Sequence, residues 1–153
     1  MSNKLIPILL LFFSLSTFAQ GGEKKMRERI KAEKVAFITN QLDLSEKEAQ
    51  GFWPIYNAYE DTVEDIKSSN IRPVRMQMRQ NPDMSEAEAE RLISKLIKAE
   101  ESLLAAKIKL VNDLKKVIPS VKILKLKAVE DQFNKRLLEK LKEFRERRMN
   151  RKN

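Results

Sequence analysis

Residues 86–117 form a stretch of 32 residues that contains no glycine or proline and has apolar side chains at helical spacing. This pattern predicts one long helix, and at 1.5 Å per residue such a helix would be roughly 48 Å long. A compact domain of this chain's size has a radius of gyration of only about 14 Å. The sequence therefore predicts an elongated, all-α hairpin or bundle of about four helices.

The composition excludes most kinds of catalytic and metal site. The 153 residues include no Cys, no His and only three Gly, which rules out disulfides, thiolate nucleophiles, zinc sites of the usual kind and glycine-rich phosphate loops. We therefore expect no enzyme, no cofactor and no metal site. The remaining enzymatic alternative is a hydrolase built on helical carboxylates, for which the candidates are Glu60, Asp61, Glu64 and Asp65.

Residues 1–19 have the pattern of a cleavable export signal. Lys4 precedes an apolar run at 5–15, and small residues lead to a cut after Ala19. The run is shorter than the roughly 20 residues that span a bilayer. We expect a periplasmic protein with one helical domain at 20–145 and a basic, flexible tail at 146–153.

Export to the periplasm limits the anionic partners that a chain with a net charge of +9 can meet. Nucleic acid is not a routine partner in the periplasm, so we expect none, and the anionic partners are acidic polypeptides or an anionic membrane surface. Residues 43–66 carry a net charge of −6 and residues 107–127 a net charge of +6. These segments either neutralise each other in the bundle or a homodimer, or leave a basic surface that attracts clients.

Two capping boxes mark helix starts. Ser45 with Glu48, and Ser85 with Glu88, have the spacing at which the hydroxyl accepts from the Glu backbone N–H and the carboxylate accepts from the Ser N–H. The helices are expected at about 23–42, from Ser45 onward, at 86–117 and at 121–149. A loop is expected at 69–83, with a short helical piece around 74–79 as an option. In the last two helices the residues expected to be buried are Ala89, Leu92, Ile93, Leu96, Leu103, Leu110, Leu114, Val117, Leu124, Leu126, Phe133, Leu137, Leu141 and Phe144.

Four aromatic residues lie close together at Phe52, Trp53, Tyr56 and Tyr59. Pro54 lies among them and removes one helical hydrogen bond, so we expect a kink in the second helix. The rings either anchor the core or present an exposed contact for a protein partner. Trp53 and Tyr56 are therefore candidate partner-binding residues.

The expected loop at 69–83 supplies the other candidates for partner binding. They are Arg72, Arg75, Met76, Met78 and Arg79. Arginine can bind carboxylates with two parallel hydrogen bonds, and flexible methionine adapts to varied apolar side chains. We expect this loop to contact partners, with an ordinary solvated connector as the alternative.

Residues 44–48 (Leu-Ser-Glu-Lys-Glu) and 84–88 (Met-Ser-Glu-Ala-Glu) resemble the two Leu-Thr-x-x-Gln boxes of the Spy/CpxP family of periplasmic chaperones and stress regulators. The aromatic motif at 52–59 is similar to that of an exported subgroup labelled sensors of sigma factors of the extracytoplasmic-function (ECF) type. Ser replaces Thr and Glu replaces Gln in both boxes, which preserves the capping chemistry.

The resemblance implies a cradle-like helical fold, often a dimer, whose basic concave surface holds polypeptides without ATP. It implies an ATP-independent chaperone or envelope-stress sensor for unfolded or membrane-associated envelope proteins. The alternative is a dedicated regulator that binds the periplasmic part of a signalling membrane protein linked to an ECF-type sigma factor. A metal sensor is not expected, because zinc or nickel would require His or Cys, which are absent. The thioethers of Met76, Met78 and Met84 are the alternative, as ligands for Cu(I).

Overall fold

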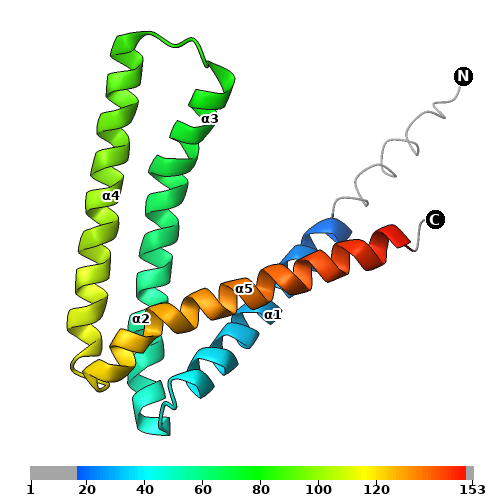
Figure 1. Cartoon of the computed structure of the whole chain (residues 1–153), viewed down its shortest axis with the longest axis vertical. Coiled ribbons are helices and arrows are strands. Elements are labelled where there is room, and N and C mark those ends of the chain that lie inside the picture. The colour runs from blue at the N-terminus through cyan, green and yellow to red at the C-terminus, as the bar shows by residue number, and fades with distance from the viewer. Residues whose placement is uncertain (1–16, 151–153) are drawn as a thin grey trace, which may run out of the picture. The chain divides into compact units, whose positions relative to one another are not determined.

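The computed structural model describes residues 17–150 of the chain, and the side chains of residues 25–150. This part of the chain is helical almost throughout and contains no strand, so the predicted all-α fold is confirmed. The elements, drawn in Figure 1, are α1 (Thr17–Gln41), α2 (Glu46–Ile66), the π-helix η1 (Lys67–Ile71), α3 (Arg72–Gln80), α4 (Glu86–Leu114) and α5 (Ser120–Asn150). Most of the expected export signal at 1–19 lies outside the described residues and stays a prediction.

The chain divides into two compact units. The first consists of Met1–Gln41 with Glu130–Asn153, and the second is Leu42–Val129. Helix α5 contributes its first residues to the second unit and the rest to the first. Each unit is described by itself.

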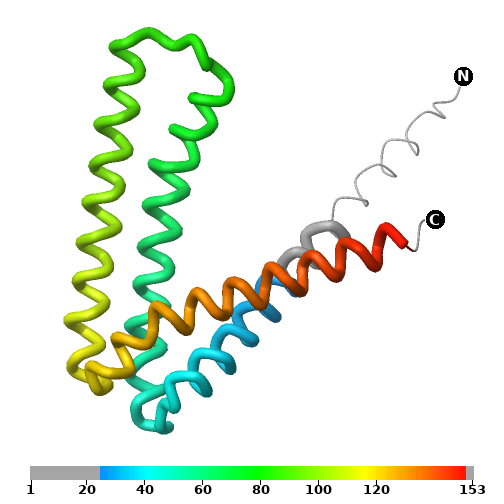
Figure 2. The backbone as a smooth tube through the Cα atoms, viewed as in Figure 1, coloured from blue at the N-terminus to red at the C-terminus, as the bar shows by residue number. Residues whose placement is uncertain are grey.

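In the second unit, α2, η1 and α3 form one continuous helical run, and α4 returns antiparallel beside it (Figures 1 and 2). The backbone stays right-handed helical through the joints at Ile66 and Arg72. The expected loop at 69–83 is therefore wrong except for the helical piece allowed at 74–79, because the chain is helical as far as Gln80 and only a short turn precedes α4.

The π-helix explains how the run passes Pro73, the residue that suggested a loop. Within η1 the Arg72 N–H bonds to the Lys67 carbonyl, five residues earlier. Pro73 then lies in the first turn of α3, where a missing N–H is tolerated. Burial of Ile71 and Val74 holds this segment to the rest of the unit.

The first capping box forms completely and the second forms by half. Ser45 Oγ accepts from the Glu48 N–H at 3.3 Å, and Glu48 Oε2 accepts from the Ser45 N–H at 2.8 Å. Ser85 Oγ accepts from the Glu88 N–H at 3.3 Å, but the Glu88 carboxylate lies 3.8 Å from Arg91 Nη2. Ser45 and Ser85 are nevertheless both N-caps, of α2 and α4 respectively.

The core of the second unit lies between α2 and α4. Phe52 and Tyr56 are buried, their rings stacked with centroids 5.3 Å apart, and Leu92, Leu110 and Leu114 are buried as predicted. Four expected core residues are exposed instead: Ile93, Leu124, Leu141 and Phe144. Ile93 is one residue from Leu92 and so points about 100° away around the helix, beyond the reach of α2.

In the first unit, α1 and α5 are joined by an aromatic contact and an ion pair. The Phe37 and Phe133 rings lie 5.7 Å apart, with the Arg136 guanidinium 5.8 Å from the Phe37 centroid. Lys140 Nζ lies 2.7 Å from a Glu33 carboxylate oxygen. Helix α5 continues to Asn150, so the first part of the expected flexible tail is helical.

Gly51 is required for close packing in the second unit. A Cβ placed on Gly51 would overlap Val117 Cγ1 in the turn after α4. The same helix passes through Pro54, so α2 contains two poor helix formers within four residues. Close approach to Val117 explains why Gly51 is favoured here despite its low helix propensity.

We predict that Gly51→Ala lowers the melting temperature. Alanine should favour the helix by about 1 kcal/mol, but overpacking against a stiff valine costs about 1–3 kcal/mol. Thermal unfolding followed by circular dichroism measures the balance. In a Val117→Ala background the same exchange should instead raise the melting temperature, and an increase in the wild-type background would contradict this packing argument.

Candidate functional site

Helix α3 presents one buried and one exposed face. Ile71 and Val74 are buried and anchor the segment. The opposite face opens onto a shallow hollow of about 700 Å³. Its lining consists of Ser68, Arg72, Pro73, Arg75, Met76, Met78 and Arg79. Five of the seven predicted partner-binding residues therefore surround one surface, which we call the α3 surface.

The charges of the α3 surface are only partly neutralised. Arg72 forms a two-pronged ion pair with Glu64, with N–O distances of 2.8 and 2.9 Å. Both side chains are exposed, so the pair orients Arg72 more than it adds stability. Among the described residues, Arg75 and Arg79 have no ion-pair partner, and as i, i+4 neighbours they share a face.

Two methionines supply the apolar part of the α3 surface. Met76 and Met78 are each 51% exposed. Their unbranched thioethers can rearrange around side chains of different shape. Guanidinium groups next to flexible apolar side chains can bind a carboxylate and an apolar group of the same partner together.

The position of η1 is the feature that the sequence pattern did not reveal. π-Helical turns in longer helices occur frequently at functional sites. Ser68 in η1 lines the hollow together with the first turn of α3. The hydrophobic pattern could have indicated the segment, because Ile71 and Val74 have helical spacing, but Pro73 obscured it.

The aromatic candidates do not line the α3 surface. Tyr56 is 1% exposed, stacked on Phe52, and belongs to the core. Trp53 is half-buried, with its ring edge-on to Phe52 at 5.0 Å. Of the two, only Trp53 retains surface that a partner could touch.

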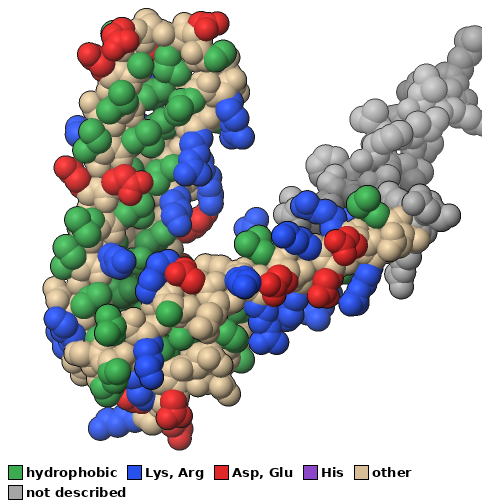
Figure 3. Space-filling view, viewed as in Figure 1, with side chains coloured by type: hydrophobic (Ala, Val, Ile, Leu, Met, Phe, Trp, Pro, Cys, Tyr) green, Lys and Arg blue, Asp and Glu red, His purple; other side chains and the backbone are tan. Residues whose placement is uncertain are grey.

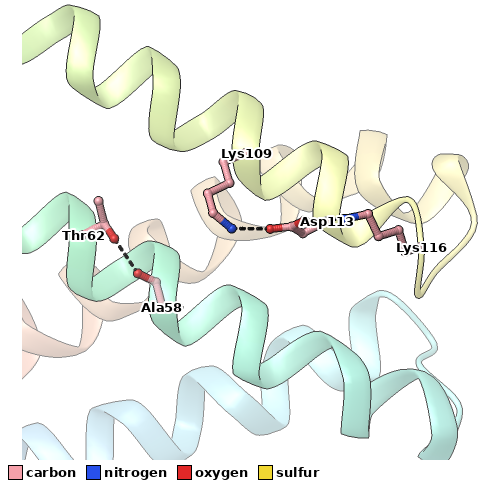
Figure 4. A network of polar contacts seen from close by, with 5 residues as sticks. All are labelled: Ala58, Thr62, Lys109, Asp113 and Lys116. Atoms are coloured by element: carbon pink, nitrogen blue, oxygen red, sulfur yellow. Dashed lines mark hydrogen bonds and ion pairs between the residues drawn. The ribbon is translucent and has the colours of Figure 1, made fainter.

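A separate groove of about 340 Å³ lies between α2 and α4, with Asp113 at its edge. Figure 4 shows Asp113 between two lysines: Lys109 Nζ is 2.5 Å from Oδ2, and Lys116 Nζ is 2.8 Å from Oδ1. Hydrogen bonds from these ammonium groups, Lys109 first, lower the pKa of Asp113 from 3.8 to about 2. A carboxylate held ionised in this way is unsuited to proton transfer near neutral pH.

The carboxylates proposed for a hydrolase do not gather into a site. Glu64 is engaged by Arg72, and Asp61 and Asp65 are exposed on α2. Within residues 17–150 no group of three or more acidic side chains could hold a metal ion. In the same range no helix has both the length and the apolar character needed to cross a bilayer.

Comparison of the chain with protein-family models, with curated proteins and with solved structures found no match. The resemblance of its capping boxes and aromatic motif to the Spy/CpxP family therefore stays a prediction.

We predict that Asp113→Asn removes part of the acid sensitivity of folding. Because the folded-state pKa of Asp113 is lowered to about 2, its stabilisation is complete above its ordinary value of 3.8 and is lost as pH falls through about 2. The melting temperatures of wild type and Asp113→Asn should therefore differ most at neutral pH and converge towards pH 2. Asp61→Asn makes the same charge change at an exposed side chain and serves as the control. A constant difference down to pH 2 would contradict the assignment.

Proposed function

We propose that this protein binds unfolded or partly folded polypeptides on the α3 surface, as an ATP-independent chaperone or stress sensor of the cell envelope. The observation that carries the proposal is the convergence of three arginines and two exposed methionines on one hollow of α3. Figure 3 shows Lys and Arg side chains gathered along the α3 part of the hairpin.

The two kinds of side chain have separate roles in binding. The arginines attract acidic segments over a distance and then bind their carboxylates. The methionines retain the apolar residues of the same segment by burial. A surface of this type discriminates little between sequences, which suits a protein with many clients.

Binding of this kind needs no nucleotide, and the chain has no glycine-rich loop to hold one. The export signal expected at 1–19 supports action in the periplasm, where ATP-dependent chaperones would lack ATP. The resemblance to the Spy/CpxP family supports the same function.

We predict that changing Arg72, Arg75 and Arg79 together to Ser weakens suppression of client aggregation while leaving helicity intact. The three side chains are exposed, and such changes rarely alter stability by more than about 0.5 kcal/mol each. The assay follows light scattering of an unfolded acidic client at an equimolar ratio, with circular dichroism as the folding check. Wild-type protection should decline as salt rises, because the screening length is about 10 Å at 0.1 M salt.

The matched control changes Arg145, Arg147 and Arg148 to Ser. This variant loses the same charge from exposed positions on α5 and should protect the client as well as wild type. Equal losses of client protection in both variants would show that the effect depends on net charge and not on the α3 surface. If wild type gives no protection at low salt and instead captures one stoichiometric membrane protein from envelope extract, the chain is a dedicated regulator.

A further inference from the structure

The net charge of the chain is concentrated in the first unit. Residues 1–41 and 130–153 contain 16 basic and 8 acidic residues, whereas residues 42–129 contain 15 basic and 14 acidic residues. The expected export signal accounts for only one of these basic residues, Lys4. Figure 3 shows Lys and Arg side chains gathered over the first unit. Most of the excess positive charge therefore belongs to the unit that does not carry the α3 surface.

The last part of α5, within the first unit, has an apolar face that α1 leaves exposed. At 100° per residue its members fall within an arc of about 140°. The side of α5 that meets α1 carries Phe133, Arg136 and Lys140, roughly 115° around the helix from the middle of this arc. The members of this α5 apolar face, each between 46% and 64% exposed, are Leu138, Leu141, Phe144 and Met149.

The charged residues of this part of α5 are ordered around the apolar face. Lys135 and Lys142 lie just beyond one edge of the arc. Lys140 and Arg147 lie beyond the other edge. The acidic residues lie on the opposite side of the helix, roughly 130–170° from the middle of the arc; they are Glu139, Glu143 and Glu146. An apolar face with basic borders is typical of a helix that lies on an anionic membrane surface.

Two further arginines lie within the arc and limit how deeply the helix can enter a membrane. Arg145 and Arg148 have no ion-pair partner among the side chains at 25–150. Arg148 also lines a hollow of about 550 Å³ together with Phe144, Arg147 and Asn150. Guanidinium groups bind phosphate through two parallel hydrogen bonds, and their stems can lie along apolar surface. This combination suits the level of the lipid phosphates, with the apolar side chains at the start of the acyl region.

We propose that residues 134–150 of α5 bind the surface of a membrane that contains anionic phospholipids. The helix lies in the plane of the surface with the α5 apolar face towards the lipid. The basic residues on both edges then contact lipid phosphates, and the acidic residues face water. This inference stands independently of the proposed function, because it uses no residue of the α3 surface.

An acidic polypeptide is the other partner that these charges would attract. Such a segment lying beside α5 would reach one edge of the apolar face. A membrane surface presents phosphate groups on both sides of the helix at once, over the roughly 20 Å from Lys135 to Arg148. Basic residues on both edges therefore favour the membrane.

We predict that the protein purified after export binds vesicles of equal parts phosphatidylglycerol and phosphatidylcholine. Vesicles of phosphatidylcholine alone should bind it about tenfold more weakly or less. An α5 variant, with Arg145, Arg147 and Arg148 changed together to Ser, should bind the anionic vesicles about a hundredfold more weakly, because each basic residue near such a surface strengthens binding roughly fivefold. Co-sedimentation with the vesicles measures binding at 0.1 M salt, where the screening length is about 10 Å.

The matched control is an α3 variant, with Arg72, Arg75 and Arg79 changed together to Ser. It loses the same charge from the other unit and should bind the vesicles to within about threefold of wild type. The two variants also separate this proposal from the proposed function. The α5 variant should lose vesicle binding and keep client protection, and the α3 variant should do the reverse.

A fluorescence experiment tests the orientation of the helix. The chain has no native cysteine, so a single introduced thiol can carry a fluorophore that is sensitive to solvent polarity. On Leu141→Cys, near the middle of the arc, the emission should shift to the blue when anionic vesicles are added. Glu139→Cys is the control, because it lies roughly 160° around the helix from position 141 and its label should stay in water.

Equal binding to neutral and anionic vesicles, unchanged binding by the α5 variant, or equal emission shifts at positions 139 and 141 would each overturn the proposal. If wild type does not bind anionic vesicles and the α5 variant loses client protection, the α5 apolar face binds polypeptides instead.

Discussion

The ion pair between Glu48 and Lys122 joins three parts of the second unit. Glu48 Oε2 accepts from the Ser45 N–H and from Lys122 Nζ, both at 2.8 Å, which connects the start of α2 to the start of α5. Lys122 also donates to the carbonyl of Asp43, where the turn after α1 adopts a φ of +48°. The Glu48 and Lys122 side chains are only 18% and 20% exposed. These hydrogen bonds, that from Lys122 above all, lower the pKa of Glu48, so the junction is fully formed above its ordinary pKa of 4.5 and weakens as pH falls below that value.

With this end of the unit fixed, the rest of the hairpin follows from packing. Gly51 lets α2 approach Val117 in the turn between α4 and α5. From the next residue onward, Phe52 and Tyr56 fill the space between α2 and α4. The hairpin then extends away from the junction through η1 to α3, which is held by Ile71 and Val74 rather than by polar contacts alone. The α3 surface thus lies at the end of the hairpin that is remote from this junction (Figure 1).

Local sequence patterns predicted the helices and the first capping box. They could not predict how the helices pack against one another. Ser45 and Glu48 predicted their own geometry because a capping box involves only neighbouring residues. The second box failed in part because the Glu88 carboxylate lies towards Arg91 instead of Ser85. Pro73 led to the prediction of a loop, because no local sequence pattern indicates a π-helical turn that places this proline in the first turn of α3. Ile93 was predicted to be buried because it fits the apolar periodicity of the helix. Periodicity shows that a helix face is apolar, but it does not show whether a neighbouring element covers that face.

The two surfaces of the second unit have a common physical origin. A hairpin of two helices buries one stripe on each helix, whereas the apolar arc of α4 is wider than one stripe. Some apolar area therefore stays in contact with water unless another chain covers it. On α4 that area is a line of exposed aliphatic side chains, Ile93, Ile97, Leu104 and Ile108. On α3 it is methionine bordered by arginine alone, which fixes neither register nor sequence. The apolar surface in excess of the core thus supplies, on α3, the permissive binding surface that the proposed function requires.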